Sequence, residues 1–194
     1  MKELDITARP STPLIGMVTR MTEQKGLDLV RAVLEELLYE NVAFVLLGSG
    51  EEQYENFFKY IADKYPDKTA ICLGYSDALA RRIYAGSDFF LMPSMFEPCG
   101  ISQMIAQRYG TLPIVRETGG LRDTVQPYNI YTQEGNGFSF ANYNAHDMLN
   151  TIWFALNVYQ DKTNLARLIQ SAMALDNSFE KSAGEYIELY KELV

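Results

Sequence analysis

Two cations with a spacing suited to a pair of phosphate groups lie in the segment Thr19–Gly26. Arg20 and Lys25 stand five positions apart, and a helical pattern begins directly after the segment, so both side chains could reach across one loop. Each charge-assisted hydrogen bond from such a cation to a phosphate contributes about 1.5–3 kcal/mol. The residues alone leave a second interpretation equally open, in which both cations are solvated on a surface loop.

A carboxylate occupies an unusual place in the run Pro93–Gln103. Glu97 lies between an aromatic residue and Pro98, and the proline restricts the backbone of Glu97 to an extended conformation. The amides of Ile101–Gln103 would begin a helix and so form an anion site. This combination favours a functional carboxylate beside a bound anion, and the structural alternative is an acid that caps the helix.

Three further segments that contain glycine follow apolar, β-rich runs. The glycines of Gly48–Gly50 would let a ligand approach the backbone, and a plain tight turn is the alternative. Tyr75 could stack on a base, and packing in the core is the alternative. The pair Gly119–Gly120, which follows Thr118, would also allow a close backbone approach, or would only form a turn.

Apolar runs alternate along the chain with amphipathic stretches, and this alternation positions the candidate residues. Strands are predicted at 14–19, 43–47, 69–73, 88–92 and 112–115, with helices at 27–39, 51–64, 78–85 and 102–109. A loop at 126–136, an edge strand at 137–140 and three helices after residue 144 complete the pattern. Strands and helices joined by short loops predict an α/β fold with a doubly wound, Rossmann-like parallel sheet. Such sheets bind ligands beyond the carboxyl ends of their strands, where all the candidate segments lie.

Composition excludes several classes of function. The chain has 194 residues and a formal net charge of −8, which disfavours nucleic acid and anionic membranes as partners. Its first residues lack the apolar region of a secretory signal, and its apolar runs are too short to span a bilayer. Two cysteines, Cys72 and Cys99, and a single histidine predict neither a disulfide framework nor a metal site, so we expect a cytoplasmic protein. Cys99 is expected to be a small buried residue.

Three segments form a specific combination: Thr19–Leu29, Pro93–Gly100 followed by Tyr109–Arg116, and Thr118–Val125. Together they resemble the bacterial glycogen synthases and plant starch synthases. The run from Phe96 to Gly100 is the most specific, because related sugar-nucleotide transferases usually carry glycine after the acid. The resemblance implies a GT-B fold, in which two Rossmann-like domains face each other across a cleft, and this chain would be the C-terminal half. Residues 1–194 would form one nucleotide-sugar-binding domain, with a residual connection at 1–13 and a helical segment at 144–194.

The family implied by this resemblance transfers glucose from ADP-glucose to the non-reducing end of an α-1,4-glucan, with retention of configuration. The resemblance implies that Arg20 and Lys25 hold the diphosphate and stabilise the departing ADP, and that Glu97 lies near the donor glucose. Tyr75 would stack on adenine. No metal is implied, and no cofactor besides the substrate ADP-glucose and the product ADP. The residues expected to bind the nucleotide sugar are Arg20, Lys25, Gly48, Ser49, Gly50, Tyr75, Cys99, Gly100, Ile101, Ser102, Thr118, Gly119 and Gly120.

The N-terminal domain of that family, which carries the groove for the glucan acceptor, has no recognisable counterpart in this sequence. We therefore expect the chain alone to bind ADP weakly and to transfer no glucose, because half of a pocket lacks pre-organisation and water exclusion. Three other functions stay open: a stand-alone module that binds nucleotide sugars, a domain that holds glycans, and a related retaining transferase that uses UDP-glucose. Glu97 argues against a pure binding module, and the run Pro98–Gly100 argues against the UDP-glucose enzyme.

Overall fold

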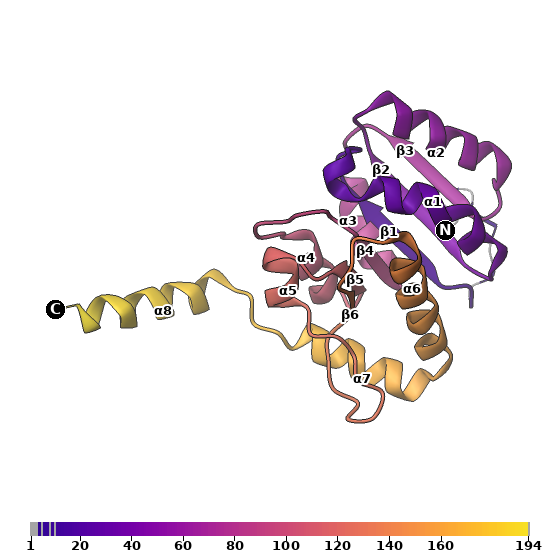
Figure 1. The fold of residues 1–194 in the computed structure, drawn as a ribbon. Coiled ribbons are helices and arrows are strands. Elements are labelled where there is room, and N and C mark those ends of the chain that lie inside the picture. The colour runs from indigo at the N-terminus through magenta and orange to yellow at the C-terminus, as the bar shows by residue number, and fades with distance from the viewer. Residues whose placement is uncertain (1–3, 5, 8, 10, 194) are drawn as a thin grey trace.

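The computed structural model describes residues 4, 6–7, 9 and 11–193, and its strands form one sheet (Figure 1). The strands are β1 (Leu14–Val18), β2 (Ala43–Gly48), β3 (Thr69–Leu73), β4 (Phe89–Met92), β5 (Leu112–Arg116) and β6 (Phe138–Phe140). Their order is β3-β2-β1-β4-β5-β6, and every neighbouring pair is parallel. The doubly wound parallel sheet predicted from the sequence is confirmed.

The direction of the strand order reverses between β1 and β4. From β1 the chain moves outward through β2 to β3, and it then returns to place β4 on the other side of β1. Pairing of Ile15 with Phe89 and of Gly16 with Phe90 fixes this junction. The connections that follow β1 and β4 therefore run in opposite directions, which leaves a crevice at the carboxyl edge of the sheet.

Helices cover both faces of the sheet (Figure 1). The helices of the described chain are η2, a 3₁₀ helix (Glu23–Lys25), α1 (Leu27–Tyr39), α2 (Glu52–Lys64), α3 (Asp77–Gly86), α4 (Ser102–Arg108), α5 (Gly119–Thr124), α6 (Ala145–Gln160), α7 (Lys162–Met173) and α8 (Phe179–Glu192), of which α8 does not pack on the sheet. One core cluster joins α1, α2, α6 and α7 to Phe44 and Phe89, and another joins α3 and α4 to Val45 and Phe90. Because successive side chains of a strand point to opposite faces, strands covered on both sides are apolar throughout.

The predicted strand and helix boundaries agree with the structure to within one residue at either end, but two short helices differ from the expectation. The segment Glu23–Lys25 is a 3₁₀ turn, and the paired glycines begin α5 although glycine disfavours helices. A Cβ at Gly120 would lie 1.9 Å from the carbonyl oxygen of Cys99. Glycine is used here because another stretch of main chain packs directly against it.

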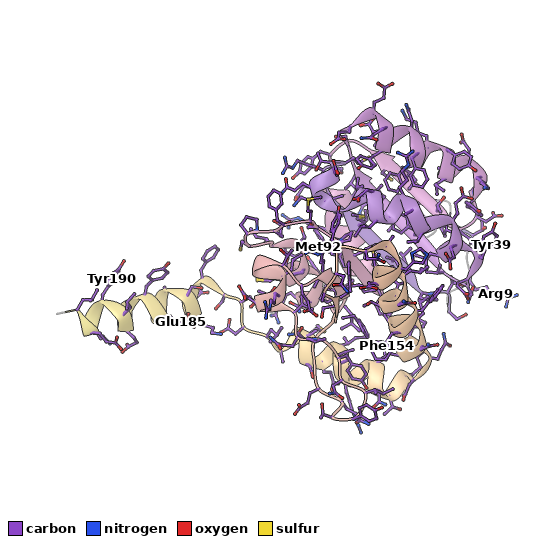
Figure 2. All side chains as sticks on the ribbon, viewed as in Figure 1. Arg9, Tyr39, Met92, Phe154, Glu185 and Tyr190 are labelled. Atoms are coloured by element: carbon purple, nitrogen blue, oxygen red, sulfur yellow. The ribbon has the colours of Figure 1, made fainter. Side chains whose placement is uncertain are left out.

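The two ends of the described chain differ in how they pack. Ile6 is buried against the cluster of α3 and α4, and Thr7 donates a hydrogen bond to Asp67, so this part of the predicted connection packs on the domain. The other predicted connection residues at 1–3, 5, 8 and 10 lie outside the described residues. At the other end α8 projects away from the sheet, and none of its residues is buried (Figures 1 and 2). None of the described helices is both long and apolar enough to cross a membrane.

Gly48, at the end of β2, provides a test of the main-chain packing beside the crevice. A Cβ at this position would lie 1.9 Å from the carbonyl oxygen of Thr19, whose amide already donates to Leu47 across the sheet. Gly48→Ala should therefore lower the free energy of unfolding by about 1–3 kcal/mol, because the main chain must shift to admit one carbon. Urea denaturation followed by circular dichroism measures this change.

The matched control is Gly86→Ala, at the exposed end of α3. No atom lies within 4 Å of a Cβ built at Gly86, so alanine should leave the free energy of unfolding unchanged or raise it slightly. Equal losses of stability in the two variants would contradict the packing argument.

Candidate functional site

A cavity of about 220 Å³ lies in the crevice at the carboxyl ends of β1 and β4. All three residues predicted to be catalytic, Arg20, Lys25 and Glu97, line it, although they come from loops more than 70 positions apart in the sequence. The rest of the lining comes from the two strand ends and from the start of α4: Met17, Val18, Thr19, Leu91, Met92, Ser94, Gly100, Ile101 and Ser102. The structure thus places the predicted cations and the predicted carboxylate in one shared cavity.

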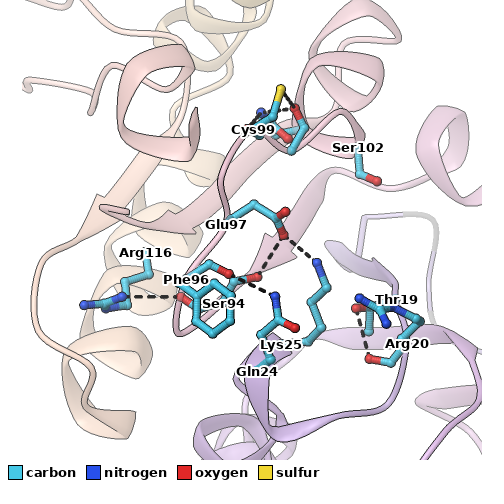
Figure 3. Close-up of polar contacts among 12 residues, drawn as sticks. Thr19, Arg20, Gln24, Lys25, Ser94, Phe96, Glu97, Cys99, Ser102 and Arg116 are labelled. Carbon is cyan, nitrogen blue, oxygen red and sulfur yellow. Dashed lines mark hydrogen bonds and ion pairs between the residues drawn. The ribbon is translucent and has the colours of Figure 1, made fainter. Parts of the chain in front are cut away.

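Lys25 and Glu97 form an ion pair across this cavity (Figure 3). The Lys25 Nζ lies 2.5 Å from the Glu97 Oε2, and the two side chains are 17% and 12% exposed. Ser94, which is buried, lies 3.5 Å from the same carboxylate oxygen through its Oγ. Partial burial strengthens the attraction between the two charges relative to a pair in open water. The pair therefore joins the two loops and keeps a cation and an anion in the cavity.

The turn that carries Lys25 depends on Gly26. Gly26 has a φ of 73°, in the left-handed region, and its amide closes the 3₁₀ turn by donating to the carbonyl of Glu23 at 2.8 Å. A Cβ at Gly26 would lie 2.1 Å from the carbonyl oxygen of Pro93. Only glycine meets both demands without strain, so the position of Lys25 follows from the residue after it.

Main-chain contacts also hold the two loops together. The Met95 amide donates to the carbonyl of Gln24 at 2.8 Å, and the Gln24 side chain donates to the carbonyl of Phe96 at 3.5 Å (Figure 3). These bonds involve the residue before Lys25 in one loop and the two residues before Glu97 in the other. The geometry of the ion pair is thus set by backbone contacts and does not rely on the two charges alone.

The paired glycines support the Glu97 loop from the other side. A Cβ at Gly119 would lie 2.1 Å from the carbonyl oxygen of Glu97, and the amide of Gly120 donates to that carbonyl at 3.1 Å. The segment that approaches these glycines closely is the main chain of Glu97–Cys99. Thr118 precedes α5 as its N-cap without a side-chain cap bond, and neither it nor the two glycines line the cavity.

Arg20 and the start of α4 complete the cavity. Arg20 is exposed at the rim, and within the described part of the chain its guanidinium makes no hydrogen bond or ion pair, so it is open to a ligand. Ile101 and Ser102 lie where α4 begins without a side-chain cap. The arrangement combines two cations and the amino end of a short helix, which is the chemistry that binds a phosphorylated ligand.

The other predicted residues, Gly48–Gly50, Tyr75 and Cys99, do not line the cavity. Gly48–Gly50 pack against the loop after β1, because Cβ atoms at Gly48 and Gly50 would meet the carbonyl oxygens of Thr19 and Met21. Tyr75 is 85% exposed after β3. The prediction that Cys99 is buried is wrong: its thiol is exposed, because the bend between Glu97 and α4 leaves this side chain outside the core.

Two contributors to the site were not singled out in the sequence. Ser94 touches the Glu97 carboxylate, and Gln24 joins the loops, and both lie inside the segments whose motifs drew attention. The sequence signal that could have identified them is their position within a few residues of Glu97 and Lys25.

Among the described residues no group of three or more histidine, cysteine, aspartate or glutamate side chains could hold a metal ion.

Comparisons with known proteins agree with this geometry. The family model described as glycosyl transferases group 1 matches residues 4–174. The chain is 56% identical over 186 residues to a glycogen synthase of Bacillus anthracis, and 52% identical over 192 residues to a glycogen synthase of Alkaliphilus metalliredigens. These matches cover 96% and 99% of this chain but 39% and 40% of the relatives, so the chain spans about two fifths of their length.

A solved structure extends the likeness to three dimensions. The catalytic domain of starch synthase IV from Arabidopsis thaliana, bound to ADP and acarbose, matches with a TM-score of 0.89 and 39% sequence identity. The match covers 98% of this chain and 40% of that one. The resemblance to glycogen and starch synthases and the Rossmann-like half of a GT-B fold are thereby confirmed. With the family model matched over residues 4–174, the chain belongs to the glycosyl transferases of group 1.

Proposed function

We propose that this chain is the donor-binding part of a glycogen synthase, which transfers glucose from ADP-glucose to the non-reducing end of an α-1,4-glucan with retention of configuration. The observation that carries the proposal is the single cavity lined by Arg20, Lys25 and Glu97. The names of the similar proteins, glycogen synthase and an ADP-bound starch synthase, support the choice of reaction and of donor. The groove for the glucan would come from the part of these relatives that this chain does not span.

The diphosphate of the donor fits beside the two cations. Arg20 and Lys25 would hold its oxygens, while the amides at Ile101 and Ser102 would meet the distal phosphate. Negative charge grows on the departing ADP as the glycosidic bond breaks, and fixed cations stabilise that charge without reorganising. The two cations therefore act as electrostatic catalysts at the leaving group.

Glu97 would lie beside the glucose. Its carboxylate can orient sugar hydroxyls or stabilise the positive charge of an oxocarbenium-like transition state. Its main chain is fixed by Gly120 and its carboxylate by Lys25, so the charge is held in place before substrate arrives. Pre-organisation of this kind is what makes a charge effective in catalysis.

Adenine would stack on Tyr75, whose ring is 85% exposed. Tyr75 directly precedes Ser76, the N-cap of α3, and Tyr84 lies in the same helix. The Tyr84 hydroxyl lies 3.1 Å from the Ser102 Oγ on the cavity wall.

The likeness to the ADP-bound starch synthase favours ADP over UDP as the nucleotide of the donor. Both cysteines are free thiols, which fits the reducing cytoplasm as the site of the reaction.

Lys25→Ala should weaken the binding of ADP by about tenfold or more, because it removes one charge-assisted hydrogen bond to the diphosphate. Isothermal titration calorimetry with ADP and UDP on this chain measures the effect. The control is Lys59→Ala, which removes an exposed lysine of α2 outside the cavity and keeps the change in net charge the same. ADP affinity that falls equally in both variants, or in neither, would refute the phosphate site.

Glu97→Gln should tighten the binding of ADP by about two- to fivefold, since the neutral side chain no longer competes with the diphosphate for Lys25. The same calorimetric titration measures this change, with Glu36→Gln on the exposed face of α1, outside the cavity, as the matched loss of one negative charge. An affinity for ADP that drops below that of the wild type would show that Glu97 does not oppose the bound anion.

Glucosyl transfer by this chain alone should stay below detection in an assay with ADP-glucose and glycogen. One wall of a donor pocket leaves its rim exposed to water, as the 53% and 63% exposure of Phe96 and Ile101 shows. Water around the reacting bond weakens the electrostatic effects on which the reaction depends. Measurable incorporation of labelled glucose into glycogen would contradict the proposed division of the active site.

A further inference from the structure

We propose that Arg116 and Tyr143 are positioning residues, which hold the loop of Lys25 against the loop of Glu97 from behind the cavity. Neither residue lines the cavity, and both act through main chain and through Asp28. The consequence for nucleotide binding rests on the proposed function, whereas the consequence for the geometry of Lys25 does not.

Arg116, at the end of β5, holds the start of the Glu97 loop (Figure 3). Its Nη1 donates to the carbonyl oxygen of Met95 at 2.5 Å and lies 3.5 Å from that of Ser94. Both carbonyls belong to the stretch of chain that leads from β4 to Glu97. Because the guanidinium is planar and rigid, it fixes the direction of these two peptide groups together.

Tyr143, just before α6, connects Arg116 to the Lys25 loop. The Arg116 guanidinium carbon lies 5.4 Å from the centre of the Tyr143 ring, within the range of a cation–π contact. The Tyr143 hydroxyl donates to the Asp28 carboxylate at 2.5 Å and lies 3.4 Å from the carbonyl oxygen of Glu23. Burial first, and then the bond to Asp28, raise the pKa of Tyr143, so the hydroxyl keeps its proton at neutral pH and acts as the donor.

These contacts hold the Lys25 turn at both of its ends. Glu23 begins the 3₁₀ turn that contains Lys25, and Asp28 lies in the first turn of α1 directly after it. Tyr143 contacts both, and through Arg116 it is joined to the backbone of Met95, whose amide also bonds to Gln24. These contacts join the Lys25 loop to the Glu97 loop by a second route behind the cavity. The distance between Lys25 and Glu97 therefore depends on both Arg116 and Tyr143.

The first experiment measures this geometry without any nucleotide. The rate at which an amine-reactive ester acylates each lysine is followed by peptide mass spectrometry at fixed pH. An ion-paired, partly buried Lys25 reacts slowly, and Tyr143→Phe should raise its rate about threefold or more, because the turn is released from Asp28. Arg116→Ala should do the same, and Arg116→Lys should restore part of the protection.

Matched controls separate positioning from a general loss of stability. Tyr65→Phe removes another tyrosine hydroxyl that is bonded to a carboxylate, that of Glu35 at 3.2 Å, with Lys64 5.5 Å from the ring centre. It should leave Lys25 protected. Lys68, which donates to the carbonyls of Leu38 and Glu40 far from the cavity, reports on loosening of the whole domain. An unchanged rate at Lys25, or an equal rise at Lys68, would overturn the proposal.

The second experiment connects the geometry to binding. Tyr143→Phe should weaken ADP binding about threefold in the wild-type background, and should have no further effect in Lys25→Ala, because its influence acts through Lys25. Additive losses in the double variant would contradict a positioning role. If the wild type binds no ADP, the proposed function fails, and the acylation rates still decide whether Arg116 and Tyr143 position Lys25.

Discussion

The adjacency of β1 and β4 is the constraint on which the site depends. These strands are neighbours in the sheet although the chain visits β2 and β3 between them, so the loops that leave them must share one crevice. Hydrophobic burial on both faces of the sheet stabilises this arrangement, and the crevice follows from the strand order. Lys25 and Glu97 meet because the core places their loops side by side.

Local charge has to act against the charge of the whole chain. A protein of formal net charge −8 repels an anion at long range, so a phosphorylated ligand depends on the few cations within hydrogen-bonding distance. In this structure one of the two, Lys25, is paired with Glu97. Because its ammonium has three N–H donors, Lys25 would share them between Glu97 and a bound diphosphate under the proposed function. The ion pair thus keeps the Lys25 ammonium ordered at the cavity wall.

The sequence predicts the sheet and the rim of the site well, because strand runs and their terminal glycines are local patterns. It does not predict the exposure of Cys99 or the contact of Tyr143 with Asp28. Both depend on how distant segments pack together, and Tyr143 and Asp28 are 115 positions apart. The helix at Gly119–Gly120 shows the same limit: intrinsic propensity favours a turn, and contact with the Glu97 loop decides otherwise.

Main-chain contact, more than side-chain contact, explains why the charges are held so closely. Gly26 admits the carbonyl of Pro93, and Gly119 and Gly120 admit those of Glu97 and Cys99. A contact between two backbones has no rotamers to lose, so it fixes a loop more rigidly than a pair of long side chains does. Electrostatic catalysis needs this rigidity, because the free energy spent on reorienting a charge is subtracted from its stabilisation of the transition state. Under the proposed function, the glycines would contribute through the precision of the loops that carry Lys25 and Glu97.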